Sequence, residues 1–479
     1  MELHVDSSNL SNLRWLIIAL PDVLTIGALL LLFVGRFLLS EEKAIKIFPK
    51  FSLIVSVLCL IVTLSYSVTN GGLSNSLFIY NSGLSNIKSI LMAFSVITFA
   101  IISITHVHRV LPSHVYIFIF GIINSINLCL SANHFLSLML GLELYTFSVC
   151  FLMLFNSDGG EDNSRAWVIR FLLASYAATA VLLYGMSLYY SVSGSLSFPK
   201  LKFDSSFQAI MGGALVISAL LFKIGAAPFH SWMIDIYDKA SLGLIMFFDA
   251  IWKLFIFFIF IRFFKFMLAG HHIHAQLFLE LISAISMTIG AIMPFFQDSI
   301  KKFIAYSSVG QAGFILSIFA VMNEISTSKT VVLYIFTYSM ASVCFFATLL
   351  NIRKSRNIPT FSDLSGLMRD SPMMGCSIVG AMFAMAGIPP FINFIAKLQM
   401  LEVQINTGHY ELLAISLVYS IMSLLYTSKA IRPIFQPRIM DYKPIKHNIM
   451  IYFTFTVLTL SSFFYSMGEG WIAWILTSI

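Results

Sequence analysis

The chain consists almost entirely of long apolar stretches separated by short polar connections. A helix of about 20 apolar residues spans the hydrocarbon core of a bilayer. Because lipid offers no partners to unpaired backbone groups, each such stretch predicts an α-helix. We expect about 14 spans, near residues 15–35, 47–69, 84–105, 112–131, 133–156, 166–193, 207–230, 243–265, 274–296, 302–322, 329–353, 373–402, 409–431 and 447–474.

The composition supports the same class. Apolar residues make up 58% of the 479 residues and charged residues 11%, with a mean hydropathy of +0.88. Soluble globular domains carry about 25% charged residues, and disordered chains are poor in apolar ones. We therefore expect an all-α polytopic membrane protein.

The basic residues indicate an orientation. Loops after odd-numbered spans hold 18 lysines and arginines, and loops after even-numbered spans hold 4. By the positive-inside rule the odd loops face the cytoplasm (or matrix). The formal net charge of +7 therefore predicts no nucleic-acid partner. We expect a bacterial inner (plasma) membrane, with the mitochondrial inner membrane as the alternative.

The cysteines predict no metal or haem site. All five stand singly in apolar runs, without a CxxC pair. They are Cys59, Cys129, Cys150, Cys344 and Cys376.

Two apolar runs carry related strings, Gly225-Ala-Ala-Pro-Phe229 and Gly387-Ile-Pro-Pro-Phe391. Proline frees backbone groups that lipid cannot satisfy, so a break there faces protein or water. We expect spans 7 and 12 to be broken helices, at Pro228 and at Pro389 and Pro390. Copies five spans apart run in opposite directions, as in inverted repeats around an ion path. Two unrelated kinks are the alternative.

The repeat hypothesis divides the chain into four parts. Spans 4–8 and spans 9–13 would form two inverted five-helix repeats. The parts are the N-terminal spans 1–3 (1–110), the first repeat (111–265), the second repeat (266–431) and the C-terminal span 14 (432–479).

Charged residues inside spans are the candidate functional groups, because each costs about 2.5–3.5 kcal/mol at mid-membrane. Glu143 lies in span 5, Lys223 in span 7, Lys253 in span 8 and Lys397 beyond the span-12 break. Burial favours the neutral form of a lysine, and a nearby carboxylate favours the charged form. We predict that these four residues form a proton relay.

Two further residues support this relay. Asp249 precedes Lys253 by four residues, so the two share a helix face and can pair. His230 follows Pro228. The alternatives are structural: static ion pairs, a hydrogen-bond donor at a helix end for His230, and a Lys397 side chain that extends towards the membrane interface.

The segment Phe222-Lys-Ile-Gly-Ala-Ala-Pro-Phe-His-Ser-Trp232 resembles the seventh-span motif of the antiporter-like subunits of respiratory complex I. Gly141-Leu-Glu-Leu144, Ile300-Lys-Lys-Phe-Ile-Ala-Tyr-Ser-Ser308 and the string from Gly387 to Lys397 continue the match in the family's order. The resemblance covers roughly residues 110–430. It fits the subunit N group (subunit 2 in mitochondria) better than the larger L and M subunits.

The resemblance implies a membrane-arm subunit of a proton-pumping NADH:quinone oxidoreductase. Glu143 would be the span-5 carboxylate and Lys223 its paired lysine. Lys253 would be the central lysine and Lys397 the exit lysine, with His230 as the motif histidine. NADH, flavin mononucleotide, iron–sulfur clusters and quinone would be bound by other subunits. Other membrane-arm subunits, lipid and protons are the implied partners.

Arg170 departs from the family, which often has a lysine early in span 6. Arginine keeps its proton, so the resemblance implies that Arg170 tunes the Glu143–Lys223 pair without carrying protons.

Two other functions of the chain remain open. One is a subunit of a monovalent cation/proton antiporter, and the other is a structural membrane subunit with inert buried charges.

Overall fold

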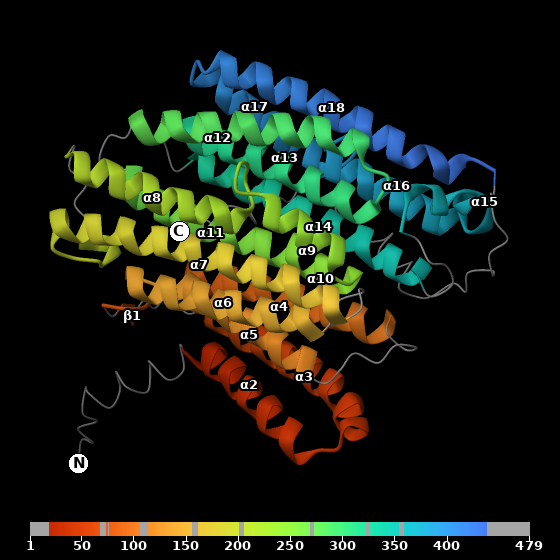
Figure 1. Ribbon diagram of the computed structural model, residues 1–479, viewed down its shortest axis with the longest axis horizontal. Helices are drawn as coiled ribbons and strands as arrows, with labels where there is room; N and C mark the ends of the chain where they lie inside the picture. The colour runs from red at the N-terminus through yellow and green to blue at the C-terminus, as the bar shows by residue number, and fades with distance from the viewer. Residues whose placement is uncertain are drawn as a thin grey trace, which may run out of the picture. The chain divides into compact units, whose positions relative to one another are not determined.

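The computed structural model describes residues 19–67, 73–74, 76–105, 114–155, 161–200, 206–268, 273–321, 326–353 and 359–437 (Figure 1). Almost all of these residues are helical, which confirms the all-α class. The α-helices and strands are α2 (Leu20–Leu38), α3 (Glu41–Ser67), β1 (Leu73–Ser74), β2 (Ile79–Tyr80), α4 (Ser82–Thr105), α5 (His114–Ser131), α6 (Phe135–Phe155), α7 (Glu161–Ser193), α8 (Phe207–Ile224), α9 (Ser231–Lys239), α10 (Leu242–Phe247), α11 (Lys253–Leu268), α12 (Ile273–Ile292), α13 (Ile300–Val321), α14 (Ser326–Arg353), α15 (Leu367–Asp370), α16 (Pro372–Ala386), α17 (Ile392–Asn406) and α18 (Tyr410–Phe435).

The helices include many that are able to span a membrane. Within the described residues, 12 helical segments are long and apolar enough, and Pro372–Ala386 is a shorter apolar helix. The chain is thus a multi-pass membrane protein. The span expected at 447–474 lies outside the described residues.

The chain forms two compact units. Among the described residues, the first contains α2 to α6, the β1–β2 hairpin and residues 195–200. The second contains α7 to α18. In the first unit, β1 and β2 pair antiparallel, and the Phe198 amide donates to the Asn133 carbonyl (3.0 Å).

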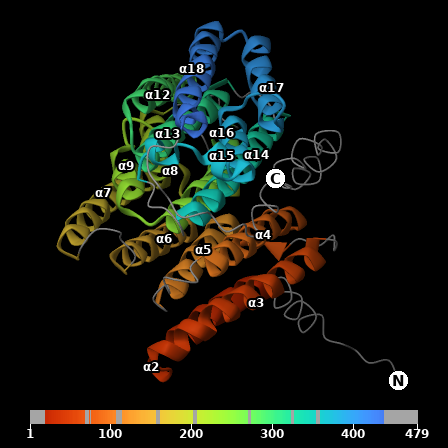
Figure 2. The same ribbon diagram turned by 90° about the vertical axis from the view of Figure 1, so that its right-hand side faces the viewer.

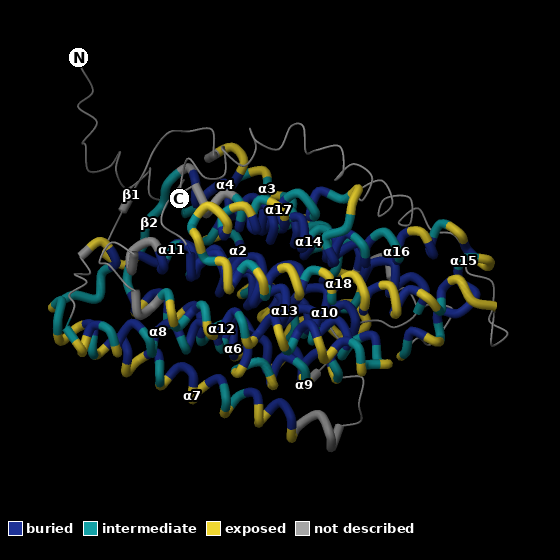
Figure 3. Tube along the Cα trace, turned by 90° about the horizontal axis from the view of Figure 1, so that it is seen from above, coloured by how far each residue is buried: buried dark blue, intermediate teal, exposed yellow. Residues whose placement is uncertain are grey.

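The second unit has a centre that is almost completely buried. Apart from Arg262, every residue from 242 to 264 is buried, and α13 is buried along almost its whole length. Figure 3 shows α10 and α13 in dark blue, whereas α7 and α18 carry exposed residues on their outer faces. Helices α16 and α17 pack against α14 and α18 (Figure 2).

Glycine brings α13 close to α12. A Cβ added at Gly290 would overlap the Cα of Gly310, and one added at Gly313 would lie 2.6 Å from the Ser286 Cβ. Small residues allow such close backbone approach in membrane helix pairs. The contact fixes the position of α13, which carries polar residues of the candidate site.

Both predicted helix breaks are present. Helix α8 ends at Gly225 (φ 78°) and α16 ends at Gly387 (φ 72°), both in the left-handed conformation that favours glycine. Each glycine precedes a cis X–proline bond, at Ala227-Pro228 and at Pro389-Pro390. The chain then resumes as the short helices α9 and α17. The inverted orientation of the two repeats stays a prediction.

One irregularity was not expected from the sequence. Between α10 and α11 the backbone forms a π-helical turn at Phe248–Trp252, in which the Lys253 amide donates to the Phe248 carbonyl. Single π turns inside α-helices often occur at functional sites. This one contains Asp249 and immediately precedes Lys253.

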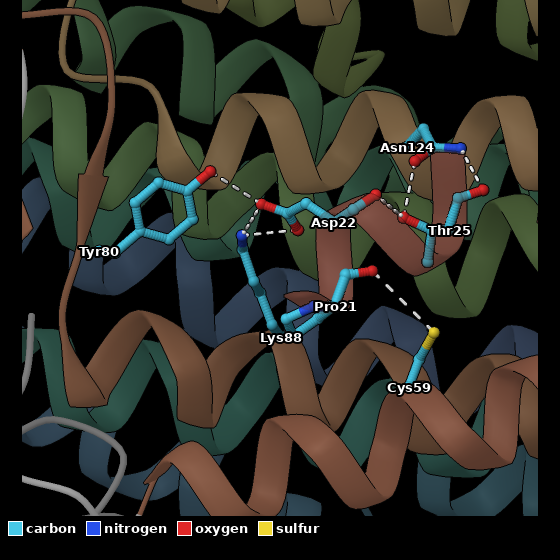
Figure 4. Close-up of polar contacts among 7 residues, drawn as sticks. All are labelled: Pro21, Asp22, Thr25, Cys59, Tyr80, Lys88 and Asn124. Carbon is cyan, nitrogen blue, oxygen red and sulfur yellow. Dashed lines mark hydrogen bonds and ion pairs between the residues drawn. The ribbon is translucent and has the colours of Figure 1, made fainter. Parts of the chain in front are cut away.

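The first unit holds a buried ion pair between α2 and α4 (Figure 4). The Lys88 Nζ lies 2.9 and 2.7 Å from the two carboxylate oxygens of Asp22, and the Tyr80 hydroxyl donates to the same group (3.0 Å). Burial first, and then the charge of Asp22, raise the pKa of the Tyr80 phenol, which therefore keeps its proton as a donor. Nearby, Asn124 Nδ2 donates to the Thr25 carbonyl (3.1 Å) and joins α5 to α2.

Breaking this pair should destabilise the first unit. Lys88→Met leaves the Asp22 carboxylate buried without its cation, so we expect a loss of about 3–5 kcal/mol in unfolding free energy. Removing both charges in Asp22→Asn/Lys88→Met should cost less than Lys88→Met alone. The measurement is thermal unfolding in detergent.

A surface pair provides the control. Arg36 and Glu41 approach to 3.7 Å with side chains 36% and 57% exposed, so Arg36→Gln should change stability by about 1 kcal/mol or less. Equal effects of Lys88→Met and Arg36→Gln would contradict a stabilising role for the buried pair.

Candidate functional site

The second unit contains three buried lysines on three different helices. Lys223 lies in the last turn of α8, Lys253 begins α11, and Lys397 lies in α17. Each is only 4% exposed. An ammonium group removed from water needs hydrogen-bond partners, and each of these lysines has them.

Lys223 stands at the carbonyl end of a half-helix. Its Nζ donates to the Ser175 hydroxyl of α7 (2.6 Å). The carbonyls at this helix end are satisfied by indole groups: Trp232 Nε1 donates to the Phe222 carbonyl (2.9 Å), and Trp252 Nε1 donates to the Lys223 carbonyl (3.2 Å). The helix dipole at this end favours a positive charge on Lys223.

Asp249 is fully buried and surrounded by hydroxyl groups. Tyr237 (3.0 Å) and Ser308 (2.9 Å) donate to one carboxylate oxygen. Ser342 (2.6 Å) and Tyr338 (3.2 Å) donate to the other. Four hydroxyl donors from α9, α13 and α14 therefore stabilise the carboxylate, and none of the ion pairs among the described residues brings a cation into direct contact with it.

Lys253 shares one of these hydroxyl groups. Its Nζ donates to the Ser308 carbonyl (2.7 Å) and to the Ser308 hydroxyl, and it lies 4.9 Å from the centre of the Tyr338 ring. The sequence indicated that Asp249 and Lys253 share a helix face and can pair. Instead, Ser308 bridges the two, and none of the ion pairs in the described part of the chain joins them directly. The π turn alters the i, i+4 relation on which that prediction rested.

Lys397 has a different environment. Its Nζ donates to the Ala386 carbonyl at the end of α16 (3.1 Å) and to the Ser423 hydroxyl (3.3 Å). It also lies 5.3 Å from the ring centres of Phe314 and Tyr419. Ring faces and a helix carbonyl end stabilise a cation. No carboxylate of the described residues forms an ion pair with it.

Gln311 lies between the two lysine sites on α13. It is one turn beyond Ser308, and its Nε2 donates to the Met385 carbonyl (3.1 Å), next to the carbonyl that accepts from Lys397. The Tyr334 hydroxyl donates to its other side-chain atom, Oε1. Sequence reasoning missed Gln311 and Ser308 as site residues, because neutral polar residues are common in membrane helices. The one signal in the sequence was that Ser308 is the last residue of the segment 300–308, which resembles a motif of the family.

The remaining predicted residues lie at less enclosed positions. Glu143 belongs to the first unit and is half-buried on α6, on a face with exposed Leu140 and Phe147. Arg170 is exposed on α7 of the second unit. His230 directly precedes α9, with its ring centre 6.4 Å from that of Tyr306. The prolines Pro228, Pro389 and Pro390 are exposed at the helix breaks.

A family model for the NADH:quinone oxidoreductase/Mrp antiporter transmembrane domain matches residues 132–423. The chain belongs to this family. The matched region contains Glu143, both helix breaks and the three lysines Lys223, Lys253 and Lys397.

Curated relatives support the same assignment. The chain is 30% identical to NADH-quinone oxidoreductase subunit N of Pelagibacter ubique over 335 residues, which are 69% of this chain and 70% of the relative. It is 31% identical to subunit N of Nitrosomonas europaea over 309 residues, 63% of this chain and 64% of the relative. In the second match the chain thus spans less than two thirds of the relative's length.

Two solved structures have the same fold. A chain of respiratory complex I from Thermus thermophilus with bound aureothin superposes with a TM-score of 0.78 at 20% identity, covering 93% of this chain and 96% of that one. A chain of the Mrp complex from Dietzia sp. DQ12-45-1b gives 0.83 at 16% identity, covering 96% and 97%. At these sequence identities, both similarities show that the fold is shared and nothing further.

Proposed function

We propose that this chain is the subunit N equivalent of an NADH:quinone oxidoreductase and forms a proton-translocation channel in its membrane arm. The observation that carries the proposal is the set of three hydrogen-bonded lysines buried in one unit, with a carboxylate beside the middle one. The names of the curated relatives support it. The chain would lie in a bacterial inner membrane beside other membrane-arm subunits. Electron transfer from NADH to quinone would take place in other subunits of the complex.

The relay works by electrostatics. A change of charge at Glu143 alters the stability of the ammonium form of Lys223, its partner by family resemblance. A proton released there passes to the Lys253 site and then to Lys397. Lys253 and Lys397 donate to backbone carbonyls and serine hydroxyls, which accept hydrogen bonds from the charged ammonium form. Buried lysines suit this task because their charge state responds to neighbouring charges.

The structural likeness to the Mrp complex favours one alternative, a subunit of a monovalent cation/proton antiporter. The test is affinity purification of the tagged chain from native membranes. We expect an NADH-oxidising peripheral arm to co-purify and NADH to drive proton uptake in inverted vesicles. Purification without that arm, together with sodium-dependent proton exchange, would favour the antiporter.

Arg170 provides a prediction about tuning. Because the proposal requires its positive charge and no proton release, Arg170→Lys should keep coupled turnover and Arg170→Ala should slow it several-fold. Quinone reductase rate and proton uptake in inverted vesicles measure both. Normal pumping in Arg170→Ala would remove the tuning role and favour inert buried charges.

A further inference from the structure

The surroundings of Asp249 differ from those of a fixed counter-ion. In the first unit, Asp22 contacts Lys88 directly with both oxygens, at 2.9 and 2.7 Å. Within the described residues Asp249 has no such contact, although Lys253 lies in the same cluster. The two charges are instead separated by the single hydroxyl of Ser308.

Every hydrogen-bond partner of the Asp249 carboxylate in the described part of the chain is a hydroxyl group. A hydroxyl rotates and is both donor and acceptor, whereas a backbone amide or an ammonium group only donates. The cluster therefore suits both forms of the carboxyl. When Asp249 is a carboxylate, the hydroxyl groups donate to it. When Asp249 is protonated, one hydroxyl group rotates and accepts the hydrogen bond of the carboxylic acid.

We propose that Asp249 and Lys253 form a two-site proton-loading pair connected by the Ser308 hydroxyl. This inference rests on the proposed function. Asp249 accepts protons arriving from the Lys223 side, because its Tyr237 donor belongs to α9, directly after the break that follows Lys223. Lys253 releases protons towards Lys397, because α13 leads from Ser308 to Gln311 and the end of α16.

The internal step conserves atoms and charge. With Asp249 protonated and Lys253 neutral, the carboxyl proton moves to the Ser308 oxygen while the hydroxyl hydrogen of Ser308 moves to the Lys253 nitrogen. One carboxyl O–H bond breaks, one N–H bond forms, and the serine hydroxyl is restored. The pair changes from acid and amine to carboxylate and ammonium, and its net charge remains zero. This avoids the cost of isolated charge in a low-dielectric interior.

The full cycle uses this step as a reset. In the carboxylate–ammonium state, an arriving proton neutralises Asp249. The ammonium group then passes a proton towards Lys397, and the Ser308 bridge returns the pair to its starting state. Ser308 is thus a positioning residue whose hydroxyl belongs to the proton path, and Ser342 only stabilises the carboxylate.

Two matched serine variants test the role of the bridge. Ser308→Ala and Ser342→Ala each remove one hydroxyl donor from Asp249, but only Ser308 contacts Lys253. We expect Ser308→Ala to slow NADH-driven proton uptake about tenfold or more, with a much smaller loss in Ser342→Ala. Ser308→Thr, which keeps the hydroxyl, should recover most of the rate. All rates are normalised to assembled complex.

Infrared difference spectra of the wild-type complex during turnover provide the second measurement. A carboxylic-acid band that shifts on carbon-13 labelling of aspartate and is absent in Asp249→Asn is expected. Equal rates in Ser308→Ala and Ser342→Ala, or the lack of such a band, would overturn the loading pair. If Lys223 and Lys397 variants lose pumping while Ser308→Ala does not, this inference alone fails. If the lysine variants pump normally, the proposed function fails.

Discussion

Lys223→Ala and Lys223→Arg should both assemble into the complex, and both should lose most NADH-driven proton pumping. Alanine removes the ammonium group that donates to Ser175 and, on the proposed pairing, leaves Glu143 without its cation. The carboxyl then takes up a proton and remains neutral. The relay loses both the charge that responds to the signal and the group that passes the proton on.

Arginine separates a relay from a salt bridge. A guanidinium group keeps the positive charge and the hydrogen bonds, but it holds its proton. In a relay, Lys223→Arg therefore blocks proton release and lowers pumping about tenfold or more, although it supports assembly better than alanine. In a static ion pair, arginine restores activity almost fully.

The measurement is quinone reductase rate and proton uptake in inverted vesicles, each normalised to assembled complex. Lys239→Met is the control, because Lys239 is an exposed lysine paired with Asp238 at 3.2 Å and lies outside the site. It should behave as wild type. Full activity of Lys223→Arg would reduce Lys223 to a structural role.

The sequence predicted those features that depend on strong local rules. Apolar runs without charges indicate membrane helices because lipid excludes unpaired backbone groups. The breaks at Gly225 and Gly387 follow from glycine and proline inside such runs. Lys223, Lys253 and Lys397 were found because a charge in an apolar run is costly and therefore stands out.

The features that the sequence did not predict depend on tertiary contacts. The Asp22–Lys88 pair joins residues 66 positions apart on different helices. The bridge through Ser308 depends on the approach of α13 and on the π turn before Lys253, and neither has a signature in local composition. The four hydroxyl groups around Asp249 come from three helices, and each alone is an ordinary polar residue of a membrane span.

The Asp249–Lys253 pair shows what a local spacing rule leaves open. The i, i+4 rule assumes a regular α-helix, and the turn at Phe248–Trp252 is a π turn. In addition, Ser308 supplies a better-placed partner to both groups. A local rule gave the correct residues, and the tertiary structure determined how they are connected.

Lys397 leads to the second prediction with a large effect. Its ammonium group is stabilised by the Ala386 carbonyl, the Ser423 hydroxyl and two aromatic rings, and no carboxylate of the described residues pairs with it. Such partners support a cation weakly, since they bring no formal negative charge. A proton that reaches Lys397 is therefore held less firmly than in an ion pair, which suits the last lysine before release.

We expect Lys397→Met to assemble and to lower NADH-driven proton uptake about tenfold or more, because methionine fills the apolar site but carries no proton. Lys397→Arg should keep the contacts with the rings and the carbonyl and still fail to pump. Lys429→Met is the matched control: Lys429 also donates to a carbonyl, that of Phe295 at 2.7 Å, but it is exposed. Proton uptake of Lys397→Met equal to that of Lys429→Met would remove Lys397 from the relay, and the buried lysine would then serve only to hold α17 against the end of α16.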